Sequence, residues 1–190
     1  MAKVTKQKII LESLRLFQEK GYNNVSVEDI CGRLGITRGT FYYHFKTKTA
    51  ILNSVYIDQR LDRSIEEISA MFSDNRWEQL WWLVEDSLNY NEELGCDVVS
   101  WLLASYLTEK TLIFRATKRS YEIYSKVIES GQRSGQFRNR TDPGTLATML
   151  FSLIHGINFE WCNQSGAFSL KDRVRHDLIL LLDVKDSCLV

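Results

Sequence analysis

The chain has 190 residues, and its 24 basic residues balance 24 acidic ones, so the formal net charge is zero. A single proline and ten glycines exclude a collagen-like or low-complexity protein, and no apolar run reaches the roughly 18 residues that a membrane span needs. The four cysteines are far apart and form no Cys-x-x-Cys pair, which excludes a disulfide framework and favours a cytoplasmic protein.

The charges are unevenly distributed along the chain. Residues 1–50 hold nine basic and four acidic residues, whereas the rest of the chain holds 15 basic and 20 acidic ones. A basic first segment followed by an acidic remainder suggests that the first segment binds a polyanion and that the rest of the chain has a different function. The N-terminus lacks the long apolar stretch of a signal peptide, so we expect no secretion signal.

Three short helices are predicted at the start of the chain. Apolar residues recur near the 3.6-residue period over 9–17, and Gly21 lies just past the last turn as a stop signal. Ser26 is the expected N-cap of a second helix, which carries acidic residues in its first turn and ends at Gly35. After a turn of about three residues, a third helix is expected over 38–44.

Helices are predicted for the rest of the chain as well. A fourth helix over 48–72 begins after Thr47 as its cap, and Asp142 followed by Pro143 is a strong helix start further on. Long amphipathic stretches follow at 77–91, 96–107, 109–133, 143–163 and 170–184. We therefore expect an all-α protein of about nine helices, with a three-helix head over 1–47 and a larger helical body over 48–190, joined by the fourth helix.

The second and third helices have the spacing of a helix-turn-helix. In such a unit the first helix braces across the DNA backbone and the turn directs the second into the major groove, which admits one helix. Arg38 can make a bidentate contact to guanine, and Thr40 can touch a base edge or a phosphate. Phe41 and Phe45, four residues apart, should lock the helix into the core of the head. The alternative is a three-helix unit whose exposed aromatic face binds another protein.

The run from Leu34 to Lys48, Leu-Gly-Ile-Thr-Arg-Gly-Thr-Phe-Tyr-Tyr-His-Phe-Lys-Thr-Lys, resembles the TetR family of bacterial transcriptional regulators. The resemblance covers about residues 5–55 and implies that the third helix reads the major groove. The implied DNA-binding residues are Ser26, Val27, Thr37, Arg38, Gly39, Thr40, Tyr42, Tyr43, His44 and Lys48. Arg38, Gly39 and Thr40 would face bases, whereas Tyr42, Tyr43, His44 and Lys48 would face phosphates.

The resemblance also contains a departure. Glu28 and Asp29 follow the start of the second helix, where a basic residue would help DNA contact. Carboxylates in a first turn favour the helix dipole, so we expect these two residues to serve the helix rather than to read bases.

A single small head binds DNA weakly, and a two-fold dimer that reads palindromic half-sites roughly doubles the contacts. The last two long helices carry apolar stripes that suit a dimer surface, and the resemblance implies a four-helix bundle there. The predicted interface residues are Leu150, Leu153, Ile154, Gly156, Ile157, Trp161, Val174, Leu178 and Leu181. The alternative is that both stripes pack the core of one protomer.

Aromatic residues of the body suggest a ligand chamber, because they combine apolar surface with polar handles. The candidate lining residues are Trp77, Trp81, Val84, Leu88, Trp101, Tyr106, Tyr121, Tyr124 and Phe159. Phe114 belongs to the same aromatic set. The same stripes could equally be ordinary core. The resemblance implies a pocket for a small lipophilic effector, and acidic neighbours leave a cationic ligand open.

The residues do not suggest an enzyme. His155 and His176 lie on separate helices without a second ligand one turn away, so we expect no metal site and no cofactor. Cys96 and Cys162 would form a redox sensor if they were adjacent, but buried small hydrophobic residues are the simpler interpretation.

Together these patterns predict a ligand-responsive transcriptional regulator, with double-stranded DNA, a second copy of itself and a small-molecule effector as partners and no membrane contact. We expect a repressor that binds a palindromic operator and is released by the effector. Two alternatives stay open: a ligand-independent DNA-bound adaptor whose aromatic body recruits a protein, and a helical-bundle enzyme or carrier with an incidental head.

Overall fold

The computed structural model describes residues 4–57, 74–108 and 110–189, and helices joined by turns and short loops make up these ranges. The helices are α1 (Lys6–Lys20), α2 (Val27–Leu34), α3 (Arg38–His44), α4 (Thr49–Ile57), α6 (Arg76–Thr108), α7 (Lys110–Arg133), α8 (Pro143–Asn163) and α9 (Leu170–Leu182), followed by a 3-10 turn, η1 (Asp186–Cys188). Within these ranges the β structure is one isolated antiparallel bridge between Phe137 and Val184. The predicted all-α class is confirmed, and the part of the linking helix beyond Ile57 lies outside the described residues.

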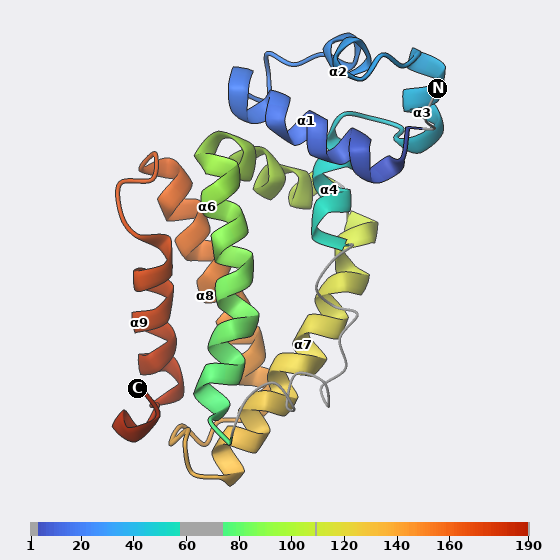
Figure 1. The fold of residues 1–190 in the computed structure, drawn as a ribbon. Helices are drawn as coiled ribbons and strands as arrows, with labels where there is room; N and C mark the ends of the chain where they lie inside the picture. Colours follow the sequence, from blue (N-terminus) through green and yellow to red (C-terminus); the bar gives the residue numbers. More distant parts are fainter. Residues whose placement is uncertain (1–3, 58–73, 109, 190) are drawn as a thin grey trace.

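A small head of short helices lies across one end of a bundle of long helices (Figure 1). The sequence starts each head helix with a local side-chain cap. The hydroxyl of Thr5 accepts from the Lys8 amide at 3.2 Å. Ser26 and Asp29 form a reciprocal capping box, and Gly35 ends α2 in the left-handed conformation, with φ 63°. The predicted start of α2 at Ser26 and its end at Gly35 are confirmed, whereas the cap at Thr5 was not predicted.

The long helix α6 is broken at Gly95, whose φ of 79° and ψ of 160° are not helical. The sequence predicts two helices here, and the structure joins them with a sharp turn at the glycine, which tolerates this conformation. The segment after Gly95 runs beneath the head, whereas the segment before it descends through the body (Figure 1). The break therefore lets one helix belong to the body and also touch the head.

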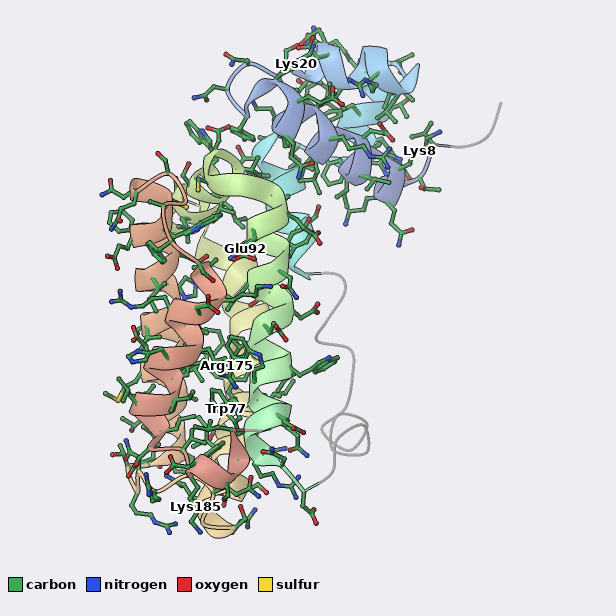
Figure 2. The ribbon with its side chains drawn as sticks, turned by 60° about the vertical axis from the view of Figure 1, so that its left-hand side comes forward. Lys8, Lys20, Trp77, Glu92, Arg175 and Lys185 are labelled. Carbon is green, nitrogen blue, oxygen red and sulfur yellow. The ribbon has the colours of Figure 1, made fainter. Side chains whose placement is uncertain are left out.

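The body is built from α6, α7, α8 and α9, which pack side by side. Val84 and Leu88 of α6 are fully buried in the core, and Trp77 is 2% exposed. Arg175 of α9 lies over the Trp77 ring, with its guanidinium carbon 5.9 Å from the ring centroid (Figure 2). Inside this core the Asn91 amide donates to the side-chain oxygen of Asn158 at 2.8 Å, so a polar pair joins α6 to α8.

The apolar stripes of α8 and α9 pack inside the body. Five of the nine predicted interface residues are buried, namely Leu150, Ile157, Trp161, Val174 and Leu178. Three more are half-buried against the same core, namely Leu153, Ile154 and Leu181. Gly156 is exposed. For the five buried residues the structure favours the alternative, in which the stripes pack the core of one protomer, because the most apolar face of each helix is covered by the protomer's own helices. The dimer surface itself stays a prediction.

None of the helices in the described ranges is long and apolar enough to cross a membrane. The same ranges contain no group of three histidine, cysteine or acidic residues placed to hold a metal ion.

Candidate nucleic-acid interface

The core of the head fixes the orientation of α3. Phe41 is fully buried and Phe45 is 4% exposed, with their ring centroids 6.1 Å apart. The opposite face of α3 is open, because Tyr43 is 84% exposed and Tyr42 is 46% exposed. The predicted packing of the two phenylalanines is thus confirmed. A short helix held from one side presents its other side outward, as groove binding requires.

The start of α3 combines a cap with exposed polar groups. The Thr37 hydroxyl accepts from the Thr40 amide at 3.1 Å and lies 3.0 Å from the Thr40 hydroxyl. Thr37 and Gly39 are exposed, whereas Thr40 and His44 are half-buried. The structure therefore brings the predicted α3 residues together on one end of the head. At α2, Ser26 is exposed and Val27 packs partly against the core.

Lys48 contacts the protein's own backbone in this structure. Its ammonium donates to the backbone oxygens of Tyr22 and Val25, at 2.6 and 2.8 Å. It also lies 4.0 Å from the centroid of the Tyr22 ring, and burial lowers the pKa of the lysine. In this structure the amine is engaged in closing the loop between α1 and α2, and the expected phosphate contact stays a prediction. Sequence reasoning counts a charge but does not show which way a long side chain turns.

The acidic residues at the start of α2 have two different roles. Asp29 accepts from the Ser26 amide and hydroxyl, at 2.8 and 2.5 Å, and these hydrogen bonds lower the pKa of its carboxyl. Glu28 instead contacts Arg38 of α3, with oxygen and nitrogen 2.9 Å apart. A hydrogen bond with Tyr42 and the charge of Glu28 raise the pKa of Arg38. The helix role expected for both acids therefore holds for Asp29, whereas Glu28 is the counter-ion of Arg38.

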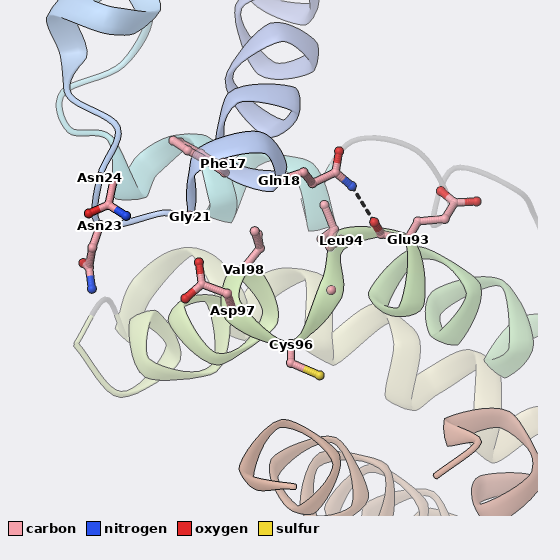
Figure 3. A pocket seen from close by; sticks show the side chains of 11 residues that line it. Phe17, Gln18, Gly21, Asn23, Asn24, Glu93, Leu94, Cys96, Asp97 and Val98 are labelled. Atoms are coloured by element: carbon pink, nitrogen blue, oxygen red, sulfur yellow. Dashed lines mark hydrogen bonds between the residues drawn. The ribbon is translucent and has the colours of Figure 1, made fainter. Parts of the chain in front are cut away.

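The head is docked on the segment of α6 that follows the break. The Tyr22 amide donates to the Asp97 carboxylate at 2.8 Å, and the Tyr22 ring lies 5.1 Å from the Trp101 ring. The Gln18 side chain donates to the backbone oxygen of Glu93, and these residues border a cleft of about 560 Å³ between head and body (Figure 3). Sequence reasoning missed this junction, although an isolated glycine in a helical pattern was the available signal.

The predicted ligand-chamber residues are not gathered in one place. Trp77, Val84 and Leu88 are core, and Trp101, 37% exposed, packs against the head rather than lining a chamber. Phe159 is 67% exposed on the surface of α8. For these five residues the structure favours the core and surface alternatives, because helical spacing alone does not distinguish an interior face from an outer one; the chamber stays a prediction.

The other aromatic residues predicted for the chamber lie in the body. Trp81 is half-buried and stacks on Trp77, with centroids 6.0 Å apart. Tyr121 and Tyr124 lie against Phe151 at 4.1 and 5.0 Å, which joins α7 to α8. The side chains of Tyr106 and Phe114 fall outside the described residues.

Comparison with known proteins gives the same picture of the head. The family model of bacterial regulatory proteins, tetR family, matches residues 9–55. The TetC protein of transposon Tn10 from Escherichia coli is 34% identical over 135 residues, which cover 68% of each chain.

Two solved structures share the fold across nearly the whole chain. SmeT, the repressor of the Stenotrophomonas maltophilia multidrug efflux pump SmeDEF, has a TM-score of 0.71 at 22% identity, covering 99% of this chain and 94% of its own. The FadR repressor of Thermus thermophilus, solved with lauroyl-CoA, has a TM-score of 0.70 at 16% identity, covering 94% and 93%.

The helix-turn-helix head, its match to the family model and the long match to TetC lead to one conclusion. The chain belongs to the TetR family of bacterial regulatory proteins and is a transcriptional regulator, not an enzyme.

Proposed function

We propose that this regulator is a repressor that binds a palindromic operator as a homodimer through α3 and is released by a small lipophilic effector. The observation that carries the DNA-binding part is the outward face of α3, where Arg38, Gly39, Tyr42 and Tyr43 are exposed opposite the buried Phe41. Arg38 and Thr40 read base edges, whereas Tyr42, Tyr43 and His44 donate to phosphates. The head comprises residues 1–47 and the effector and dimerisation domain 48–190.

The dimer is supported by the outer face of α8, not by the stripes that the sequence favours. Exposed positions recur at alternating steps of four and three residues, namely Thr145, Met149, Ser152, Gly156, Phe159 and Asn163. This spacing is that of a helix seam packed knobs-into-holes. Met149 is 48% exposed and Phe159 is 67% exposed, and a Cβ at Gly156 would meet nothing within 4 Å. Gly156 therefore leaves room for the close approach of a second helix.

On α9 the exposed Leu180, 66% accessible, lies one turn from the exposed His176 and extends the same kind of surface. Large apolar side chains left in water on two neighbouring helices are typical of a covered interface. The two helices of each protomer would form a four-helix bundle, and the heads would then be presented together to half-sites one helical turn apart.

The effector is proposed by analogy with related proteins and by the geometry of the junction. The FadR proteins of Thermus thermophilus and Bacillus subtilis were solved with lauroyl-CoA and stearoyl-CoA, and a Saccharomonospora viridis regulator with choline. In this chain the break at Gly95 joins the body segment of α6 to the segment that holds Tyr22 of the head. A ligand that favours one arrangement of the body a hundredfold supplies about 2.7 kcal/mol per site to move the heads.

The DNA-binding proposal is tested by selecting duplexes from a random pool with the purified protein, followed by mobility shifts against random competitor at fixed salt. We expect the wild-type protein to select a palindrome. The affinity of Arg38→Ala for this palindrome should be lower by roughly 5- to 150-fold, and its base preference should be relaxed at one position of each half-site. Tyr43→Phe should weaken all duplexes alike, because a phosphate contact carries no sequence information. Equal losses on selected and random DNA in Arg38→Ala would contradict the assignment of base reading to this residue.

The dimer is tested by sedimentation of Phe159→Glu, which places a charge in the middle of the proposed seam. We expect a monomer that keeps its helical circular dichroism and loses cooperative binding to the palindrome. Leu11→Glu is the matched control, since Leu11 is also an exposed apolar residue, at 51%, but lies on α1. A Phe159→Glu protein that remains dimeric would refute the seam.

The effector is tested by thermal unfolding and mobility shift with a panel of long-chain acyl thioesters and lipophilic amines. A compound that raises the unfolding temperature and also releases the palindrome supports the proposal. If DNA binding is selective but no lipophilic compound affects it, the ligand-independent adaptor is the better description.

A further inference from the structure

The first turn of α2 presents a carboxylate to the residue expected to read bases. The Glu28 Oε1 atom lies 2.9 Å from the Arg38 Nη1 atom, and the two side chains are 57% and 64% exposed. The neighbouring acid is not available for this contact, because Asp29 accepts from Ser26 and lies 3.8 Å from Lys20. Glu28 is therefore the carboxylate that accompanies Arg38 on the outward side of the head.

We expect the Glu28–Arg38 ion pair to contribute little to the stability of the fold. An exposed pair in water is screened, and most such pairs contribute little to stability. Another exposed pair of the head is Arg33 with Glu19, whose atoms are 2.6 Å apart and which joins α2 to α1 rather than to α3. The Glu28–Arg38 pair differs from the Arg33–Glu19 pair in its position. It connects the two helices of the helix-turn-helix, where a bound duplex would displace the surrounding water.

Next to DNA the glutamate has two opposite effects. Its negative charge repels the phosphates of any duplex, so it lowers the affinity that does not depend on sequence. At the same time, a guanidinium has five N–H donors in a fixed plane, so Arg38 can keep Glu28 and Tyr42 as partners and still offer donors to guanine. The pair thus limits the directions in which the arginine can point.

We propose that Glu28 is a specificity-determining residue, which orients Arg38 toward one base pair and penalises every duplex that fails to supply it. This inference rests on the proposed base reading by Arg38. At the right site the oriented arginine meets its acceptors and the carboxylate stays neutralised. At a wrong site Arg38 stays paired with Glu28 but gains no base contact, so nothing offsets the repulsion between the Glu28 carboxylate and the phosphates. The affinities for right and wrong sites therefore differ more than they would without the glutamate.

The test compares wild type, Glu28→Gln and Glu28→Asp on the duplex selected by the wild-type protein and on random duplex, over a series of salt concentrations. Glu28→Gln removes the charge, and we expect it to bind random duplex roughly threefold to tenfold more tightly, with a salt slope steeper by about one. Its ratio of specific to random affinity should fall by a similar factor. A repeated selection should show relaxed preference at the base pair that Arg38→Ala also relaxes.

The other variants separate charge from orientation and from folding. Glu28→Asp keeps the charge on a shorter side chain, so random binding should stay weak while preference at that base pair still relaxes. Glu19→Gln is the matched control, since it breaks the exposed pair with Arg33, and it should leave both the affinity ratio and the preferred base unchanged. Thermal unfolding of each variant checks that the head is intact.

The outcomes also distinguish the inference from the function on which it rests. If the wild-type protein selects no duplex at all, the proposed function fails first. If the wild type is selective but Glu28→Gln keeps the same ratio and the same base preference, base reading by the head stands and the role of Glu28 is refuted. The same holds if Glu19→Gln produces the changes expected of Glu28→Gln.

Discussion

Replacing Lys48 with methionine tests how the head is held closed. Methionine keeps most of the apolar stem but removes the ammonium, which donates to the backbone oxygens of Tyr22 and Val25 and lies over the Tyr22 ring. Both oxygens belong to the loop between α1 and α2, so the lysine connects the start of α4 to that loop. We expect Lys48→Met to loosen the loop and leave the recognition face unchanged.

The magnitude follows from the contacts. A hydrogen bond to a charged group contributes about 1.5–3 kcal/mol, and a cation over an exposed aromatic ring adds about 0.5–1 kcal/mol. The side chain is only partly buried, and the desolvation that lowers its pKa offsets part of this gain. We therefore expect a net loss of about 2–3 kcal/mol in the free energy of unfolding, or roughly 5–10 °C in the melting temperature of a chain of this size.

The assay is urea unfolding followed by circular dichroism, together with amide hydrogen exchange over residues 22–30. The exchange of these amides should accelerate in Lys48→Met while the body helices stay protected. The salt slope of DNA binding should be the same as in wild type if the Lys48 ammonium keeps its two backbone oxygens as partners when DNA binds. A variant with unchanged stability and a salt slope shallower by about one would refute the reasoning and support the predicted phosphate contact of Lys48.

Four further predictions concern stability and reactivity. Gly131→Ala should lower the free energy of unfolding by about 1–3 kcal/mol in urea titrations, because a Cβ there would lie 2.3 Å from the Phe137 ring. Gly32 is a helical glycine at which an added Cβ would meet nothing within 4 Å, so Gly32→Ala should instead raise the free energy of unfolding by about 0.5–1 kcal/mol. Hydrogen bonds from the next turn lower the pKa of Asp142 in the folded chain, so its contribution is present above about pH 4 and is lost as the pH falls through the folded pKa. Between pH 6 and 3 the melting temperature should therefore fall less steeply with pH in Asp142→Asn than in wild type. Equal slopes for the two proteins would contradict the role of the charge. Burial raises the pKa of the Cys162 thiol to about 11. The rate at which iodoacetamide alkylates Cys162 should therefore be low at neutral pH and rise roughly tenfold per pH unit. A rate that levels off near pH 8 would contradict this prediction.

The features that could be predicted from the sequence depend on residues close together in the chain. The capping box of Ser26 and Asp29, the turn at Gly35 and the burial of Phe41 each follow from spacings of a few residues. Such local chemistry operates wherever the segment lies in the molecule, because a cap satisfies the free amides of its own helix. The three helices of the head and their helix-turn-helix spacing therefore follow from the amino-acid sequence alone.

The features that the sequence did not decide depend on what covers each helix. Periodicity marks an apolar face on α8, but only the packing of the body shows that Leu150 lies inside while Phe159 lies outside. The direction of Lys48 and its two carbonyl partners, and the pairing of Glu28 with Arg38, join residues from different helices. Local sequence determined which helices form and where they start, whereas tertiary structure decided which faces are buried and which charges are paired, because those depend on neighbours distant in the chain.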